Sequence, residues 1–571
     1  FCNNCKIYHL DKDKHRCNVM RQELKSKKII QTYIAFDFEC FFDKFNYHIC
    51  NLVRTQNLET GERLRFKNIE DFTSYWSQQK NTTFIAHNLK GYDGFILLNH
   101  LVRNNQNQKP DFITLAGNKI MTMSFKTVKF IDSLNFLQMR LSDFPKTFCL
   151  GDDFKKGYFP YIFNKKINFG YKGRIPSKQY YEPQKMSCFK GCCGMCKALP
   201  LNKNPIECSY CDFNKWYEEQ EDKLYDFDKE LEDYCISDVD ILAKGLNVFR
   251  RDMMAINEGI DPLESITIAS YAMKIYKTLH APTENQLDTE YDGKISIIDN
   301  NIGDSTAFSV LKEDEYKKIK KSFYGGRTEV FRLYSKMSNE DIKNGRYIRY
   351  IDIKSLYPSS QFLDYLPYGT PKTITYNNIG VNGNTWIKNN KNFFGFVRCD
   401  ISPPKNLFIP LLPNKNFNEI TQKREGKLVF SCEDMRNATI PTPEFWKALE
   451  LGYKVGNIYE TIEFKKSKHL FRDYIRKFMK IKEENAGSKL NQIELKKYCD
   501  EWENRYDIHL EPDKFKKRPS YKSLAKLLLN SLWGRWGMKC DMPNNEFIGH
   551  SNIDKWYELQ KLHKKGDVLI K

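Results

Sequence analysis

Hydrophobic and polar positions in the first half of the chain switch between the periods of strands and helices. Residues 30–40 are rich in β-branched and aromatic side chains with alternating polarity, which predicts a strand. Residues 83–86 and 127–134 predict two more strands, and apolar side chains three residues apart over 95–101 predict a helix. Apolar residues recur at helical spacing through 226–250, which predicts one long amphipathic helix.

The second half of the chain has the same mixed pattern. A helical stretch over 262–280 leads into a polar connector at 288–304, where we expect a domain boundary. Residues 347–353 predict a strand that opens a second α/β unit. Two helices are predicted over 471–484 and 521–533, separated by a polar, charged, hairpin-like segment. The expected fold class is therefore α/β, in an α+β multidomain arrangement.

Length and composition support a globular protein of several domains. A chain of 571 residues is long for one core, and 41% hydrophobic with 14% aromatic residues is enough for packing. Lys and Arg total 91 against 72 Asp and Glu, a net charge of +19, and they alternate with aromatic residues. That mixture favours a channel that follows phosphates and stacks bases, although a basic protein without nucleic acid has the same composition.

Membrane and secretion signals do not occur in the sequence. No apolar run approaches the roughly 18 residues that a membrane helix needs, and no signal peptide opens the chain. We therefore expect a soluble, intracellular protein with no membrane partner. Its compartment in the host, whether nucleus, cytoplasm or mitochondrion, is left open.

Two clusters among the 17 cysteines have zinc-type spacing. Cys193, Cys196, Cys208 and Cys211 read Cys-x2-Cys-x11-Cys-x2-Cys, which is typical of a structural Zn²⁺ site, with free thiols as the alternative. A second cluster, Cys-x2-Cys-x9-His-x-Cys over residues 2–17, has an unusual last spacing and fits zinc or free thiols equally. Four protein ligands leave no open position, so neither cluster is expected to be catalytic.

Acidic residues recur at three places where a strand, a turn and a helix are predicted. Asp37 and Glu39 are two apart on a strand, so both carboxylates face one side, where they repel each other unless a cation binds them. Asn88 and Asp93 lie at a strand-to-helix turn, where a third carboxylate could join.

The third place lies on the predicted helix 226–250. Tyr234 and Asp238 are four apart and therefore neighbours on one helical face. Four carboxylates and a tyrosine in this order predict a site for two divalent ions about 3.5–4 Å apart, with the tyrosine orienting a water molecule. Each motif alone is more often a solvated polar face, but their joint occurrence favours the metal site.

These residues resemble a known family. The three groups are similar to the proofreading exonuclease motifs of family B DNA polymerases, in the form Phe36-Asp37-Phe38-Glu39, His87-Asn88 with Gly91-Tyr92-Asp93, and Tyr234-x3-Asp238. The separation of Asn88 and Asp93 is most similar to that of protein-primed members from linear plasmids, viruses and self-synthesising transposons. The resemblance implies a ribonuclease H-like 3′-to-5′ exonuclease domain that binds two Mg²⁺ ions, with Asn88 contacting the substrate.

A further carboxylate, Asp352, ends the strand predicted over 347–353, and Tyr357 follows five positions later. The run from Asp352 to Pro358 resembles the first polymerase motif of the same family. The resemblance implies that Asp352 binds both catalytic Mg²⁺ ions and that Tyr357 blocks a ribose 2′-OH. The alternative is a buried strand followed by a turn at Pro358.

The run from Lys526 to Gly534 is similar to the second polymerase motif. On a helix Lys526, Asn530 and Trp533 share a face, so a cation can meet the incoming phosphates while Asn530 and Gly534 shape the base pocket. Trp533 stands where the family more usually has Tyr. The alternative is a basic amphipathic helix without a ligand.

Two further motifs have weaker patterns. Lys480 and Lys482 are candidate phosphate ligands, with an exposed Lys/Glu face as the alternative. Phe323-Tyr324-Gly325-Gly326 resembles the Tyr-x-Gly-Gly linker of the family, with Phe323 in place of the first Tyr. The resemblance implies that Gly325 and Gly326 let the backbone approach the template closely, whereas ordinary turns use the same residues.

The third polymerase motif of the family, Asp-Thr-Asp on a hairpin, does not occur after Gly534. One carboxylate cannot hold two Mg²⁺ ions, so we expect a chain truncated before this motif and inactive in nucleotide addition. The expected domains are a Cys/His segment (1–29), an exonuclease domain (30–250) with a Cys-rich insertion (185–215), a linker and start of the palm (251–340), a palm with an insertion (341–470), fingers (471–540) and the start of a returning palm (541–571).

The sequence is thus expected to contain most of a protein-primed family B DNA polymerase, an exonuclease domain followed by an incomplete palm with helical fingers. Its expected partners are a DNA template, a primer strand and deoxynucleoside triphosphates, and the family implies a terminal protein as primer. A stand-alone 3′-to-5′ exonuclease and a catalytically dead DNA-binding remnant are the alternatives.

Overall fold

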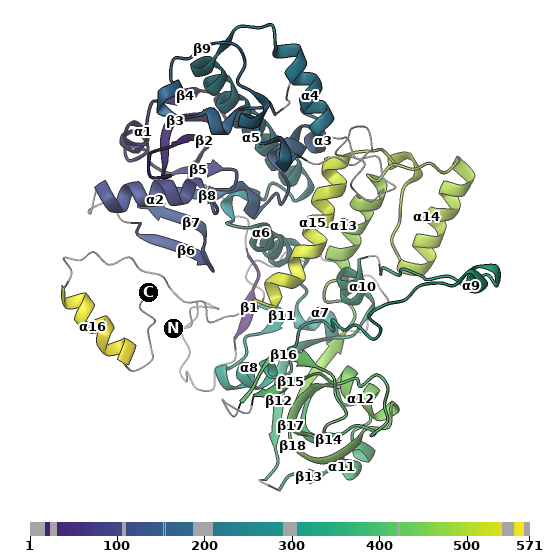
Figure 1. Cartoon of the computed structure of the whole chain (residues 1–571). Coiled ribbons are helices and arrows are strands. Elements are labelled where there is room, and N and C mark those ends of the chain that lie inside the picture. The colour runs from purple at the N-terminus through teal and green to yellow at the C-terminus, as the bar shows by residue number, and fades with distance from the viewer. Residues whose placement is uncertain are drawn as a thin grey trace. The chain divides into compact units, whose positions relative to one another are not determined.

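The chain forms two compact units in a computed structural model (Figure 1). Unit 2 comprises residues 25–273 and 479–571, and unit 1 comprises residues 1–24 and 274–478. The structure describes residues 17–22, 31–104, 110–151, 154, 156–186, 209–288, 305–353, 355–377, 379–418, 423–538 and 553–564. The predicted connector at 288–304 and the three cysteines at 193, 196 and 208 lie outside them, apart from residue 288.

A seven-stranded mixed sheet forms the centre of unit 2, in the order β4-β3-β2-β5-β8-β7-β6. β2 pairs in parallel with β5 and β5 with β8, and the other neighbours are antiparallel. The strands are β2 (Thr32–Phe42), β3 (His48–Asn57), β4 (Arg63–Phe66), β5 (Thr82–Ala86), β6 (Phe112–Ala116), β7 (Lys119–Phe125) and β8 (Val128–Asp132). The three predicted strands of this region are confirmed.

Helices cover both faces of this sheet, because its strands carry side chains alternately on either side. Phe36 and Phe38 of β2 pack in one apolar core with residues of α1 (Ile69–Trp76) and α2 (Asp93–Asn104). The opposite face of β2 and β3 contacts α5 (Phe227–Ile256), the predicted long helix. β2 therefore presents its intervening residues toward α5.

The remaining elements of unit 2 lie in the insertion and near the C-terminal end of the chain. α15 packs against α3 and α5. The elements are α3 (Phe144–Phe148), β9 (Lys172–Gly173), α4 (Ser209–Gln220), β10 (Tyr225–Asp226), α14 (Gln492–Tyr506), α15 (Pro519–Trp536) and α16 (Ile553–Lys564), while α6 (Ile268–Ile275) and α13 (Arg472–Glu484) run across the unit boundaries.

The helices predicted over 471–484 and 521–533 are confirmed as α13 and α15. The segment between them was predicted to be hairpin-like, and this is wrong, because it contains the fifteen-residue helix α14. Its start has a capping box, in which Asn491 and Glu494 each accept a backbone hydrogen bond from the other residue.

Unit 1 is built on a second sheet, in the order β1-β11-β12-β18-β14-β17, with β13 paired to β18 and a separate hairpin β15–β16. Its strands are β1 (Asn18–Met20), β11 (Ser305–Ser309), β12 (Leu366–Thr375), β13 (Val381–Asn382), β14 (Gly395–Ser402), β15 (Asn414–Asn418), β16 (Lys423–Val429), β17 (Met435–Pro441) and β18 (Lys454–Ser467). Its short helices are α7 (Glu284–Asp288), α8 (Glu313–Lys320), α9 (Asn339–Lys343), α10 (Leu356–Leu363), α11 (Gly383–Asn389) and α12 (Thr442–Glu450).

The strand predicted over 347–353 is wrong. These residues have no strand conformation, and apolar side chains that the pattern places in a core are exposed, Tyr350 to 94% and Ile351 to 73%. A strand is stable only where a neighbouring strand satisfies its backbone groups, and no described residue pairs with this segment.

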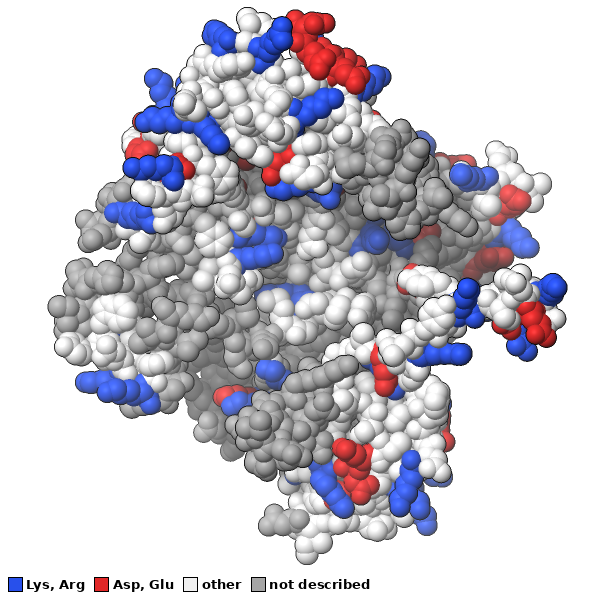
Figure 2. Space-filling model, viewed as in Figure 1, with Lys and Arg blue, Asp and Glu red and all other residues white. Residues whose placement is uncertain are grey.

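Two surface properties complete the description. No helix within the described ranges is long and apolar enough to cross a membrane. Figure 2 shows Lys and Arg side chains in several separate groups over the visible face rather than in one continuous patch.

Candidate metal centre

Strand β2 supplies the first two acidic side chains of the site. Asp37 and Glu39 alternate with Phe36 and Phe38, which lie in the core under α1 and α2, so both carboxylates face α5. Glu39 is buried and Asp37 is half-buried. The predicted common face of the two carboxylates is confirmed.

The turn between β5 and α2 supplies the third carboxylate. Asp132, at the end of β8, accepts hydrogen bonds from the backbone N–H groups of Asn88 (3.1 Å) and Lys90 (2.8 Å) and so fixes the turn. Asn88 adopts a left-handed conformation with φ of 74° and is exposed. Asp93 follows as the first residue of α2 and is buried, as the predicted strand-to-helix turn requires.

Helix α5 supplies the remaining groups from one face. Tyr234 and Asp238 are both buried, and burial together with the charge of the nearby Asp238 raises the pKa of the Tyr234 hydroxyl. Cys235 lies beside them, and its thiol donates a long hydrogen bond of 3.9 Å to the Asp37 carbonyl. Ligand atoms of Asp37, Glu39 and Cys235 lie within 4.8 Å of one another.

The four carboxylates repel one another unless their negative charge is neutralised. Burial raises the pKa of Asp37 well above its usual range, and the charges of Asp93, Glu39 and Asp238 raise it further. Burial likewise raises the pKa of Glu39 to about 8, with a contribution from Asp238, and that of Asp93 to about 7. Burial and mutual repulsion disfavour the charged forms, so bound cations are needed to keep all four groups deprotonated.

Two carboxylate oxygens within the cluster are suited to binding a cation. Among the described residues, Asp93 Oδ1 and Asp238 Oδ1 are buried and have no hydrogen-bond partner. Buried acceptors without a partner are costly, and hard oxygen ligands from several carboxylates are what Mg²⁺ binds. The donor set therefore fits a magnesium site, and the buried Cys235 thiol, whose pKa burial raises, is not required for it.

Sequence reasoning missed two residues of this site. Lys156 Nζ lies 2.5 Å from Asp238 Oδ2, and Tyr161 is hydrogen-bonded through its hydroxyl to that of Tyr234. Burial lowers the pKa of Lys156, but Asp238 and Tyr161 outweigh this and raise it overall. Both residues lie in an irregular stretch with 3-10 turns, which has no period that could reveal them.

A cavity of about 390 Å³ opens beside the turn that holds Asn88. It is lined by His87, Lys90, Leu134, Gln138, Met139 and Arg140. His87 Nδ1 is 2.8 Å from Ser133 Oγ, and burial together with the charge of Lys156 lowers the pKa of His87 to about 4, which keeps the ring neutral.

The candidate polymerase residues are divided between the two units. Asp352, Tyr357, Gly325 and Gly326 belong to unit 1, where all four are exposed and Asp352 is not on a strand. Lys482, Lys526, Asn530 and Gly534 belong to unit 2. Their role in one shared site stays a prediction.

Helix α15 has the face that its sequence predicts. Lys526, Asn530 and Trp533 are exposed along one side, while Leu528, Leu529 and Leu532 are buried on the other. The predicted common face of Lys526, Asn530 and Trp533 is confirmed.

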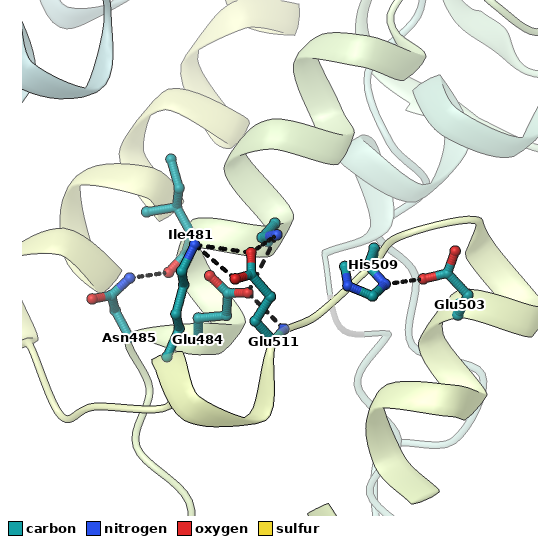
Figure 3. Close-up of polar contacts among 8 residues, drawn as sticks. Ile481, Glu484, Asn485, Glu503, His509 and Glu511 are labelled. Carbon is teal, nitrogen blue, oxygen red and sulfur yellow. Dashed lines mark hydrogen bonds and ion pairs between the residues drawn. The ribbon is translucent and has the colours of Figure 1, made fainter. Parts of the chain in front are cut away.

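Two of the lysines of α13, Lys480 and Lys482, are engaged by carboxylates. Lys480 forms an ion pair of 2.6 Å with Glu511, which also pairs with Lys514, and Glu484 accepts the backbone N–H of Glu511 (Figure 3). Lys482 is buried with its Nζ 3.2 Å from Glu483. Their role as phosphate ligands stays a prediction.

The cysteine clusters are only partly described. Cys211 lies half-buried in the first turn of α4, and Cys17 is buried next to β1. The other predicted zinc ligands lie outside the described residues, so both zinc sites stay predictions.

Comparison with known proteins identifies the family. The sequence profile of DNA polymerase type B, organellar and viral, matches residues 75–192 and 199–568. The chain belongs to this family. The matched region begins after β2, so Asp37 and Glu39 lie outside it. β2 nevertheless pairs with β5, which lies inside the matched region.

Several polymerases are similar in sequence at a low level of identity. A probable DNA polymerase of Podospora anserina is 24% identical over 79% of this chain and 29% of its own length, and one of Agaricus bitorquis is 24% identical over 84% and 49%. The DNA polymerase of Bacillus phage phi29 is 21% identical over 85% and 64%. This chain thus spans less than two thirds of the length of these relatives.

The fold of this chain is also similar to that of a DNA polymerase of known structure. Phi29 DNA polymerase in an orthorhombic crystal form has a TM-score of 0.51 at 16% identity, covering 91% of this chain and 71% of the phi29 chain. At this identity the likeness establishes a shared fold.

Proposed function

We propose that this protein is a DNA-directed DNA polymerase that also removes nucleotides from single-stranded 3′ ends, and that residues 31–256 carry the exonuclease. The observation that supports the exonuclease most is the convergence of four carboxylates from β2, α2 and α5. Their buried oxygens without partners give the cluster a strong tendency to bind cations.

Each residue of the cluster has a distinct task in this proposal. Two Mg²⁺ ions held by Asp37, Glu39, Asp93 and Asp238 would activate a water molecule and stabilise the departing 3′ oxygen. Tyr234, whose hydroxyl is hydrogen-bonded to that of Tyr161, would orient that water. Lys156 compensates part of the negative charge at Asp238.

The polymerase activity rests on family membership. A phi29 structure of the same fold contains primer-template DNA and incoming nucleotide, and we propose these as partners of this protein too, with a terminal protein as the primer. The residues assigned to nucleotide addition are Asp352, Tyr357, Lys482, Lys526, Asn530, Gly534, Gly325 and Gly326. A structural Zn²⁺ at Cys193, Cys196, Cys208 and Cys211 completes the proposal.

The exonuclease is tested by mutating β2. The Asp37→Ala, Glu39→Ala double variant should lose Mg²⁺-dependent release of nucleotides from a 3′-labelled single strand by about 10³-fold or more, since it removes two metal ligands. A Glu62→Ala, Glu70→Ala variant, which changes two exposed acids of the same unit, serves as control. Unchanged degradation by the β2 variant would refute the metal-site assignment.

A further inference from the structure

The tip of the β2–β3 hairpin exposes an unusual number of large apolar side chains. We define the hairpin tip as residues 41–49. Phe45 is 67% exposed and Tyr47 is 59% exposed, and Phe42 and Ile49 are exposed as well. The side chains of Phe45 and Tyr47 do not hold the hairpin together, because hydrogen bonds within the loop fix its conformation.

Those hydrogen bonds make the hairpin tip a defined loop. Asp43 Oδ1 accepts backbone hydrogen bonds from Phe45 and Tyr47, both 2.8 Å, and the Asp43 N–H donates to the Tyr47 carbonyl at 3.0 Å. Asn46 adopts the left-handed conformation with φ of 62° that the turn requires. The aromatic rings are therefore presented from a backbone whose shape is already set.

The hairpin tip is tied to the metal centre through two connections. It continues β2, so Phe42 follows Glu39 by three residues, a distance of about 10 Å along a strand. His48 Nδ1 also lies 2.7 Å from the hydroxyl of Tyr92, the residue that precedes Asp93. A strand of DNA whose 3′ end reaches the carboxylates is thus within reach of this loop.

Cations accompany the exposed rings. Lys44 Nζ lies 4.9 Å from the ring centre of Phe45, and the guanidinium carbon of Arg103 lies 6.0 Å from that of Tyr47. Aromatic faces alternating with cations bind single-stranded nucleic acid, in which bases stack on the rings and phosphates approach the charges. An apolar protein partner would find these charges unfavourable at the centre of its contact.

We propose that the hairpin tip is a binding surface for single-stranded DNA, which guides a 3′-terminal strand into the carboxylate cluster. Bases stack on Phe45 and Tyr47, and Lys44 and Arg103 pair with backbone phosphates. The proposal rests on the proposed exonuclease function, and it adds the surface that holds the strand behind the scissile bond.

The test compares a Phe45→Ala, Tyr47→Ala variant with Phe112→Ala, which removes a ring 51% exposed on β6, a strand separated from β2 by three others in the sheet. We measure the Kd for a fluorescent 16-nucleotide single strand without divalent metal. We also measure exonuclease KM and kcat, and Mg²⁺-dependent hydrolysis of thymidine 5′-(p-nitrophenyl phosphate), which is too short to reach the loop.

The hairpin variant should raise Kd and KM for the oligonucleotide by at least about 10-fold, since each stacked base is worth between about 5- and 150-fold. Hydrolysis of the small ester should not change, and Phe45→Trp with Tyr47→Trp should retain binding. Lys44→Gln should reduce the slope of log Kd against log salt by about 0.7, as loss of one phosphate contact requires.

Binding within about twofold of the unmodified protein would overturn the proposal, and so would an equal loss of small-ester hydrolysis, which would assign the rings to support of the metal centre. Failure of the exonuclease assignment is distinguishable. In that case no variant hydrolyses either substrate, while the metal-free Kd measurements still test the hairpin tip directly.

Discussion

The carboxylate cluster of unit 2 and the Asp352 segment of unit 1 differ in how completely each is built. The four acids of the cluster come from strands and helices that share one sheet, and three of them are buried. Asp352 lies in an exposed stretch without strand conformation, although the sequence predicts a strand there as well.

The difference shows which kind of site a local fold can complete by itself. β2 pairs with β5 and contacts α5 within one compact unit, so the cluster has its geometry before any ligand binds. The residues grouped with Asp352 by sequence are shared between two units.

The largest effect should separate the two carboxylate sites. Asp37→Asn is expected to reduce Mg²⁺-dependent degradation of single strands by about 10³-fold or more, because it removes a charged metal ligand from a buried cluster. Asp352→Asn should leave the same rate within about twofold. A comparable loss in both variants, measured with a 3′-labelled oligonucleotide, would contradict the separation of the sites.

A smaller effect should follow from Lys156→Ala. The variant leaves Asp238 without its ion pair and increases repulsion in the cluster, so we expect kcat to fall by about 10- to 100-fold at saturating Mg²⁺. Lys166→Ala, an exposed lysine of the same unit, is the matched control and should be neutral. Equal rates for both variants would remove Lys156 from the site.

The turn that carries Asn88 should respond to Gly91→Ala. A methyl group at residue 91 would lie 2.7 Å from Asn88 Oδ1, so the Asn88 side chain must move. We expect up to about tenfold lower exonuclease activity, with a change in the free energy of unfolding below about 1 kcal/mol. At Gly157 an added methyl meets only Tyr234 at 3.8 Å, so Gly157→Ala should retain activity. An unaffected Gly91→Ala enzyme would show that the turn tolerates displacement of Asn88.

The last prediction concerns the pH dependence of the free energy of unfolding in EDTA. The Glu39 carboxyl has a pKa of about 8 in the folded protein against a usual 4.5, so folding favours its protonated form. That stabilisation is complete below about pH 4.5 and is lost as pH rises to about 8, so the free energy of unfolding should fall across this window. Mg²⁺ should reverse the loss above pH 7, and Glu39→Gln should flatten the curve in urea titrations. A rise in stability with pH in EDTA would contradict the electrostatics of the cluster.

The sequence predicts which side chains share a face in two of the three motifs, because these two motifs have a visible period. Two-residue spacing places Asp37 with Glu39, and four-residue spacing places Tyr234 with Asp238. Lys156 and Tyr161 escape prediction because irregular backbone has no period. The predicted strand at 347–353 is wrong for a different reason. An apolar run indicates that a strand could be buried there, but it does not indicate which strand would pair with it.

The contact of α15 with α3 and α5 has a consequence for the order of folding. α15 is far from α3 and α5 in the sequence, and residues 274–478 of unit 1 are encoded between α5 and α15. The central sheet and its acids can assemble while the ribosome is still producing the inserted half, whereas α15 docks only after synthesis has passed it. The entropic cost of bringing α15 back to α3 and α5 grows only slowly with the number of inserted residues. Late docking of α15 should therefore slow folding more than it lowers the stability of the folded protein.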